Sequence, residues 1–409
     1  MSQRLIISAM CLASPGTMGG NSKITLEMAR HLRKKYEIHF IVPDAKVETI
    51  KQNIPDCLYD IHLHVVSQYP GNDKFDVIGA TRHYLPQIKA ALSEMRANHD
   101  DWLFGVGDFH PDAVPGFLLQ KQFGYRWLPS AFLFVPFIVE NLVKGYKFPP
   151  FLYLLAWAYA KLYVFFASFR ATGFVITNKS DFCQFPWRFR RQGRLFPYYG
   201  GVNTEQLQPP LSAEEKRGRV VFCSRLHQQK GIDGLLDIWK MVVNDPKLSD
   251  GKSGIIPRLL VIGNGDPAYE KYLKDKANRL GIADSIEWLG YVNNVDKFKI
   301  YASARIHVHP TVFDNNGMVA AEALCSGLPV VMYDLPSLRH VYNTGCLKVK
   351  FVDKAAYAKA IVSLLTDDAI YAKTAPNDEE LTALRAHWDW KNRAKEFNRW
   401  LEKLSAVGR

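Results

Sequence analysis

Short apolar runs alternate with helical patterns along almost the whole chain, and this alternation is the strongest constraint on its fold. In the first half, strand-like runs lie at 5–10, 37–42, 61–66, 102–106 and 174–177, and the segment 24–32 has helical periodicity. Apolar strands that alternate with helices form parallel sheets with right-handed crossovers. The first half therefore predicts a Rossmann-like α/β domain.

The same alternation starts again after Pro209 and Pro210. Strand-like runs lie at 219–224, 258–263, 286–290, 304–310 and 327–333, with helical segments at 231–243 and 269–280. A chain of 409 residues is long enough for two cores. We therefore expect a second Rossmann-like domain over 204–387, following a first over 1–203.

The segment 314–331 contains the most informative group of polar residues. Asp314 and Glu322 lie eight residues apart across an expected loop-to-helix junction, with Gly317 where the helix begins. A helix N-terminus offers free N–H groups and a partial positive charge, which suit a diphosphate. Carboxylates on both sides of such a site can hold hydroxyls at both ends of a nucleotide sugar.

Arg225 and Lys230 lie five residues apart in an expected strand-to-helix loop. Two such cations can converge on one diphosphate and neutralise a leaving group without a metal ion. The alternative is a solvated loop, in which lysine and arginine are common. No DxD-like cluster ends a strand, so we expect no obligatory metal and no cofactor beyond the nucleotide sugar itself.

Glycines follow several of the expected strands. Gly19 and Gly20 lie between the first strand and its helix, while Gly263, Gly265 and Gly290 close strands of the second half. Ligands of open α/β sheets bind at the carboxyl ends of strands, where glycine lets the backbone approach an anion. Each glycine also fits an ordinary tight turn.

Three histidines deserve a chemical interpretation. Asp108 and His110 follow a strand, where they can contact a sugar or assist proton transfer, or else serve as a helix N-cap and a structural histidine. His307 and His309 share one face of a strand, but no third ligand lies at metal spacing. We therefore predict no metal site there.

Taken together, the ordered motifs resemble a GT-B glycosyltransferase of the family 4 type. The resemblance covers nearly all of the chain and is strongest over 219–333. It implies two Rossmann-like domains facing a central cleft, the first binding the acceptor and the second the nucleotide-sugar donor. It also implies that a terminal helix over 388–409, starting near Trp388 and Trp390, returns to complete the first domain.

The resemblance also assigns roles to individual residues. Glu322 would bind the ribose hydroxyls, and Asp314 replaces a glutamate that lies near the donor sugar and the reacting centre. Asn316 stands where an aromatic residue is usual. The remaining donor-binding positions are backbone or loop positions, namely Gly19, Gly20, Gly263, Gly265, Gly290, Tyr291, Gly317, Met318 and Val319. The group expected at the reacting centre comprises Asp314, Arg225, Lys230, Asp108 and His110.

The implied activity is a retaining transfer from a UDP- or GDP-linked sugar to a glycan or a lipid-linked acceptor. Two alternatives stay open. The replacement of the usual residues at 314 and 316 fits a non-catalytic GT-B partner subunit, and a GT-B nucleotide-sugar epimerase would share the same donor site. The base, the sugar and the acceptor are not specified by the motifs.

The charge balance favours anionic partners. The net charge is +12, and positions 140–194 hold nine Lys or Arg residues, from Lys144 and Lys147 to Arg194, against Glu140 and Asp181. The run 151–169 approaches the length of a membrane span, but its central Lys161 favours a buried or membrane-surface helix. We expect a cytoplasmic protein docked on an anionic inner membrane face, with ordinary basic surface as the alternative and no nucleic acid partner.

Overall fold

The computed structural model describes residues 3–15, 18–71, 76–108, 110–132, 134, 150–250 and 254–407. Lys144, Lys147 and Glu140 lie outside these ranges. Packing divides the chain into two compact units, one comprising Met1–Gly200 with Trp390–Arg409 and the other Gly201–Asp389. Each unit contains a parallel sheet with helices between the strands, so the predicted α/β fold of two Rossmann-like domains is confirmed.

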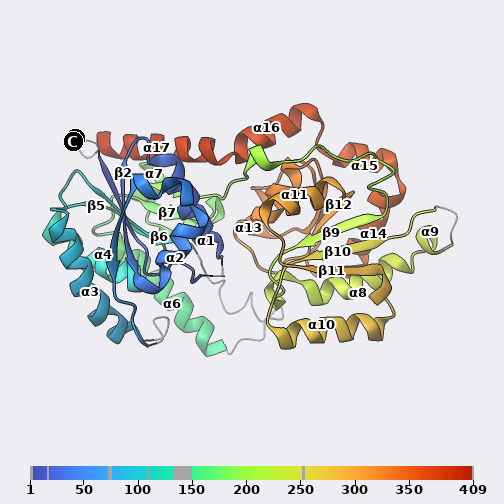
Figure 1. The fold of residues 1–409 in the computed structure, drawn as a ribbon, viewed down its shortest axis with the longest axis horizontal. Helices are drawn as coiled ribbons and strands as arrows, with labels where there is room; N and C mark the ends of the chain where they lie inside the picture. The colour runs from blue at the N-terminus through green and yellow to red at the C-terminus, as the bar shows by residue number, and fades with distance from the viewer. Residues whose placement is uncertain are drawn as a thin grey trace. The chain divides into compact units, whose positions relative to one another are not determined.

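A five-stranded parallel sheet in the order β3-β2-β1-β4-β5 forms the centre of the first unit (Figure 1). Its strands are β1 (Arg4–Ser8), β2 (Glu37–Pro43), β3 (Ile61–Val66), β4 (Trp102–Gly105) and β5 (Arg126–Leu128). A second sheet has the order β6 (Ser130–Ala131), β7 (Phe174–Ile176) and β8 (Leu195–Pro197). The patterns predicted β7, which lies within the run 174–177, but not β5, β6 or β8, whose two or three residues are too few to show a period.

The helices of the first unit are α1 (Gly20–Leu32), α2 (Val47–Asn53), α3 (Val77–Glu94), α4 (His110–Phe123), α6 (Pro150–Ala167), α7 (Trp187–Arg191) and α17 (Trp390–Val407). Although α17 is last in the chain, it packs against α1. The Tyr36 hydroxyl donates to Asn398 Oδ1 at 2.9 Å, and Trp400 Nε1 donates to the Gly193 carbonyl at 2.8 Å. The terminal helix is therefore an integral part of this unit.

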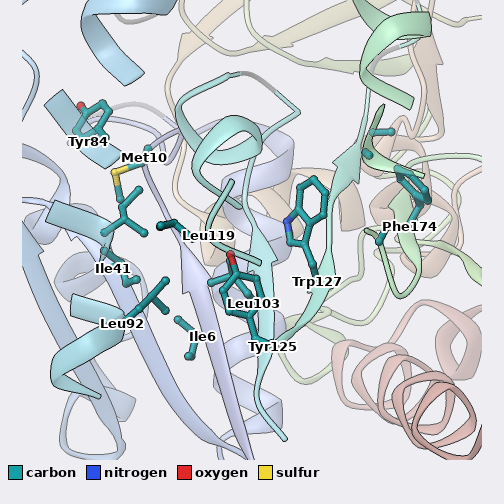
Figure 2. Packing of buried hydrophobic residues seen from close by; sticks show 14 of the residues in the cluster. Ile6, Met10, Ile41, Tyr84, Leu92, Leu103, Leu119, Tyr125, Trp127 and Phe174 are labelled. Carbon is teal, nitrogen blue, oxygen red and sulfur yellow. The ribbon is translucent and has the colours of Figure 1, made fainter. Parts of the chain in front are cut away.

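Figure 2 shows a hydrophobic cluster inside the first unit. Ile6, Ile41 and Leu103 come from β1, β2 and β4, and each is fully or almost fully buried. Tyr84 and Leu92 reach the same cluster from α3. Because the central strands are apolar on both faces, they can be covered by helices on both sides, as a parallel sheet requires.

The second unit is built on a six-stranded parallel sheet in the order β11-β10-β9-β12-β13-β14. Its strands are β9 (Arg219–Cys223), β10 (Arg258–Ile262), β11 (Ile286–Gly290), β12 (Ile306–His309), β13 (Val330–Tyr333) and β14 (Cys346–Val349). Strand order reverses at β9, which pairs with both β10 and β12. Ligands of such sheets bind outside the carboxyl ends of the strands at this reversal.

The helices of the second unit are α8 (Ile232–Val243), α9 (Pro246–Ser249), α10 (Pro267–Leu280), α11 (Asn294–Ala302), α12 (Met318–Cys325), α13 (Pro336–Arg339), α14 (Lys354–Thr366), α15 (Asp368–Thr374) and α16 (Asp378–Trp388). Helix α8 packs against both α10 and α14, and α12 packs against α16. Trp388 at the end of α16 stacks on Tyr342 with ring centroids 5.6 Å apart. Trp388 and Trp390 thus belong to different units.

The buried carboxylate of Asp112 joins the ends of β1 and β4 in the first unit. Its Oδ1 accepts from the Ser8 hydroxyl at 2.7 Å and from Met10 N at 2.9 Å. Its Oδ2 accepts from Cys11 N and Gly107 N, both at 3.1 Å. One side chain therefore satisfies three backbone donors in the two loops that follow the strands.

Replacing this carboxylate should destabilise the first unit. We expect Asp112→Ala to lower the free energy of unfolding by about 3 kcal/mol or more, because three buried N–H groups and one hydroxyl lose their acceptor. Urea unfolding followed by fluorescence measures the loss. Asp100→Ala, which truncates a side chain that is 67% exposed, is the control and should change stability by less than about 0.5 kcal/mol. Equal stabilities of the two variants would contradict the assigned role.

Candidate active site

An ion pair between Lys230 and Asp314 lies at the reversal point of the second sheet. Lys230 ends a short turn between β9 and α8, and Asp314 lies in the loop between β12 and α12. Lys230 Nζ is 2.7 Å from Asp314 Oδ2, and the two side chains are only 16% and 12% exposed. The structure therefore brings together two of the residues predicted for the reacting centre.

The surroundings of Asp314 keep it ionised. Burial raises the pKa of this carboxyl, but the Lys230 ammonium and the hydrogen bonds from Lys230 and Asn316 N outweigh burial and lower the pKa to about 2. Its Oδ1 accepts from Asn316 N at 3.2 Å and from Gly317 N at 3.1 Å. At neutral pH Asp314 is thus a fixed anion and cannot serve as a proton donor.

The loops that carry this pair are fastened to each other through their backbones. Gln229 Nε2 donates to the Phe313 carbonyl at 2.8 Å, and Val312 N donates to the Gln229 carbonyl at 3.0 Å. Gly231 has φ 72°, and a Cβ at this position would lie 2.0 Å from the Pro310 carbonyl oxygen. Only glycine allows the β9 and β12 loops to approach this closely.

Gly263, Gly265 and Gly290 serve a similar backbone contact after β10 and β11. A Cβ on Gly263 would lie 1.8 Å from the Ser224 carbonyl oxygen, and one on Gly265 would lie 2.3 Å from the Leu226 carbonyl oxygen. Gly263 N donates to the Gly290 carbonyl at 2.7 Å. In this structure these glycines pack neighbouring loops together.

Helix α12 directs its N-terminus to the same edge of the sheet. Gly317 is its N-cap in the left-handed conformation with φ 61°, and neither a side-chain cap nor an acidic residue occupies the first turn among the residues described. The Tyr342 hydroxyl donates to the carbonyls of Asn316 and Gly317 at 2.6 and 2.8 Å, which holds this junction. Met318 and Val319 begin the helix, where backbone N–H groups lack intrahelical acceptors and attract anions.

The Asn316 side chain is only 8% exposed. Neither its Oδ1 nor its Nδ2 has a hydrogen-bond partner within the described part of the chain. Buried amides are almost always hydrogen-bonded, so this side chain is one to which a bound molecule can supply the missing partner. It lies next to the N-cap of α12, where the donor was predicted.

Glu322 lies one turn into α12 and forms an ion pair that the sequence did not predict. Lys297 Nζ from α11 is 2.7 Å from Glu322 Oε2, and the side chains are 9% and 4% exposed. Burial lowers the pKa of Lys297, but the Glu322 carboxylate outweighs burial and raises it, so Lys297 stays charged at neutral pH. Lys299, two residues further along the same helix, is 62% exposed, and nothing in the local sequence distinguishes the two lysines.

Arg225 and Tyr291 are more accessible than the ion pairs, whereas the two histidines of β12 are buried. Arg225 is exposed in the loop after β9, and Tyr291 is 79% exposed after β11. His307 and His309 lie inward on β12 and are 0% and 3% exposed. His309 Nε2 is 3.6 Å from Asp314 Oδ2, so this histidine borders the ion pair.

In the first unit, Gly19 and Gly20 lie at the N-terminus of α1. Gly19 is the N-cap, and no side chain caps this helix or places an acid in its first turn within the described residues. Asp108 Oδ2 accepts from Phe132 N at 3.0 Å, and its carbonyl accepts from the Tyr159 hydroxyl at 3.1 Å. His110 is 3% exposed and begins α4. The Asp108 carboxylate therefore holds the backbone at Phe132, whereas the Asp112 carboxylate joins the loops after β1 and β4.

Each unit has a parallel α/β sheet with helices between its strands, as in the two domains of the GT-B fold. The chain is similar in structure to Anabaena HepE, solved in complex with UDP and glucose, with a TM-score of 0.70 at 14% identity, covering 98% of this chain and 99% of that one. At this identity the similarity establishes the fold alone. The chain is therefore a GT-B protein.

Sequence similarity is concentrated in the second unit. Residues 203–380 match the model of the family described as glycosyl transferases group 1. A phosphatidyl-myo-inositol mannosyltransferase of Mycobacterium leprae is 30% identical over 215 residues, 51% of this chain and 53% of that protein. An uncharacterized glycosyltransferase of Methanocaldococcus jannaschii is 31% identical over 155 residues, 35% and 37% of the two chains. The matches span about half or less of these relatives.

Titration of the buried histidines should make stability depend on pH. Burial lowers the pKa of His307 to about 3 and that of His309 to about 4, against an ordinary value of 6.5. The folded state therefore prefers neutral rings, and stability that is complete above pH 6.5 is lost as the pH falls below it.

We expect His307→Phe to remove about half of the folding stability that these two histidines cost the protein at low pH. Between pH 7 and pH 5 it should lose about 2 kcal/mol less stability than the wild type, since one buried ring no longer resists protonation. Urea unfolding at both pH values measures the difference. His99→Phe, at an 81% exposed side chain, is the matched control. A His307 variant with the wild-type pH dependence would contradict the assignment.

Proposed function

We propose that this chain is a retaining glycosyltransferase that moves a sugar from a nucleotide-sugar donor to a glycan or lipid-linked acceptor. The observation that carries the proposal is the Lys230–Asp314 pair at the end of β9 and β12, within the segment that matches the glycosyl transferases group 1 family. The structural neighbour that binds UDP and glucose and the relative named a mannosyltransferase support a nucleotide sugar as the donor.

The donor diphosphate is bound at the N-terminus of α12. The backbone N–H groups of Met318 and Val319 and the ammonium of Lys230 provide positive charge there, and the exposed Arg225 provides a second cation from the same loop as Lys230. As the glycosidic bond breaks, negative charge grows on the departing diphosphate. Fixed cations and a helix end stabilise that charge more in the transition state than in the ground state.

The nucleoside is held by Glu322. Lys297 Nζ donates a hydrogen bond to Glu322 Oε2 at 2.7 Å. That contact fixes the orientation of the carboxylate, which can then accept hydrogen bonds from the ribose hydroxyls. Lys297 is accordingly a positioning residue.

The sugar is recognised beside Asp314 and Asn316. The buried Asn316 amide offers one acceptor and two donors to sugar hydroxyls. Asp314 remains anionic, so it orients Lys230 and stabilises positive charge on the reacting sugar without supplying a proton. Proton transfer from the acceptor then falls to another group.

The acceptor side of the proposal rests on the surface of α6 and α7. Helix α6 exposes Leu162, Phe165 and Phe166 by more than half, and Phe169 and Trp187 follow at 65% and 64%. The arginines of α7, Arg188, Arg190 and Arg191, are exposed beside them. No described helix is long and apolar enough to cross a membrane. An apolar surface flanked by arginines suits docking on anionic lipid headgroups at the inner membrane face.

The donor site is tested by release of nucleoside diphosphate from a panel of UDP- and GDP-linked sugars, with and without candidate acceptors. We expect acceptor-dependent release from one donor. Arg225→Ala and Lys230→Ala should each lower kcat by about 10²–10³, because each removes a cation that stabilises the departing diphosphate. Arg258→Ala, at an exposed arginine at the opposite end of β10, is the control and should keep wild-type turnover.

Three outcomes would contradict the proposal. Binding of nucleotide sugars without release under any acceptor condition would identify a non-catalytic GT-B subunit. Release that needs no acceptor would identify a nucleotide-sugar epimerase. Wild-type kcat in both the Arg225 and the Lys230 variants would remove these residues from the reaction.

Membrane docking is tested separately with vesicles. We expect the protein to bind vesicles that contain anionic lipid more tightly than zwitterionic ones, and Phe165→Ser with Phe169→Ser to weaken binding at least about tenfold, since two apolar side chains leave the interface. Leu118→Ser, at a leucine of α4 that is 46% exposed, is the matched control. Equal binding by all three proteins would contradict docking through α6.

A further inference from the structure

Three histidines and a glutamate meet at the edge of the first unit's sheet. Glu37 and His39 lie two residues apart on β2, and His62 and His64 lie two residues apart on the edge strand β3. The strands pair in parallel with His39 opposite His62. Because side chains alternate along a strand, all four side chains project from the same face of the sheet. Parallel pairing unites two segments that are far apart in the sequence.

The spacing of the ligand atoms fits a metal ion. Glu37 Oε1 is 3.0 Å from His39 Nε2 and 3.5 Å from His62 Nε2, and the three ligand atoms all lie within 4.8 Å of one another. Ligands bound to Zn²⁺ at about 2.0–2.2 Å in a tetrahedron lie about 3.3–3.6 Å apart. An ion between these atoms therefore requires only small side-chain movements.

A fourth residue orients the central ligand. His39 Nδ1 is 3.0 Å from His64 Nε2, which leaves His39 Nε2 directed at Glu37. Metal-bound histidines almost always donate their other ring N–H to a neighbouring acceptor, and this fixes the tautomer and the ring. His64 is thus a positioning residue, not a ligand.

We propose that Glu37, His39 and His62 bind a divalent transition metal ion, with Zn²⁺ as the first candidate. Two imidazole nitrogens and one carboxylate oxygen suit Zn²⁺ and leave a fourth position for water. The Glu37 and His62 side chains are 39% and 56% exposed, so the ion can enter from solvent, while His39 is 8% exposed and anchors the site. The ion would hold the edge strand β3 to β2 and take no part in the proposed sugar transfer.

The site is tested with the purified, metal-free full chain and Co²⁺, whose visible absorption reports ligand geometry. We expect one equivalent of Co²⁺ to bind with the intense visible bands of a four-coordinate site, without the near-ultraviolet thiolate band that the six cysteines would produce. Zn²⁺ should displace Co²⁺ and raise the melting temperature, since an ion that binds only the folded state stabilises it.

Variants assign the binding to these residues. His62→Ala and Glu37→Gln should each weaken Co²⁺ binding by at least about 100-fold, and His64→Ala by about 10–100-fold. His62 and Glu37 are partly exposed, so both variants should fold, which their melting temperatures without metal will verify. His99→Ala, at an exposed histidine, should bind like the wild type. A thiolate band, or wild-type affinity in the His62 and Glu37 variants, would overturn the proposal.

Discussion

The ion pair between Lys230 and Asp314 forms because of the strand order of the second sheet. Because β9 lies between β10 and β12, the loops that follow β9 and β12 end at the same place although 84 residues separate the two charges. The pair is largely buried, and breaking it would leave an uncompensated charge. Three neighbouring features accompany this ion pair. They are the close backbone contact at Gly231, the turn at Asp314 and the N-terminus of α12.

Much of this architecture could be predicted because local sequence patterns, namely apolar segments and glycines, indicate the strands and the loops. The strands β1, β2, β3, β9, β10 and β11 are five to seven residues long and mainly apolar, and glycines lie in the loops whose backbones approach closely. The start of α12 was predicted near Gly317, between Asp314 and Glu322. In the structure Gly317 is the N-cap of α12 and takes the left-handed conformation. The two- and three-residue strands β6 and β8 carry no such pattern and could not be predicted, whereas the equally short β7 lies within the apolar run 174–177.

The partners of the buried charges could not be predicted, for a different reason. Lys297 and Lys299 look alike in the sequence, and only packing directs Lys297 toward Glu322. Asp112 lies two residues beyond His110, yet it is Asp112 that accepts hydrogen bonds from the loops after β1 and β4. His39 and His62 become neighbours only through strand pairing. These contacts depend on tertiary structure and leave no periodic signal.

Burial and neighbouring charges set the protonation states of His309 and Asp314 in the second unit. His309 borders Asp314, but burial lowers the pKa of His309 to about 4, so its ring is neutral at physiological pH. Burial acts in the opposite direction on Asp314, where the Lys230 ammonium overcomes it. Asp314 therefore stays anionic beside the Lys230 ammonium. Such fixed charges can stabilise a charge that moves from sugar to diphosphate, whereas they cannot carry a proton. In the proposed transfer, the proton of the acceptor hydroxyl must therefore leave through a group outside this pair.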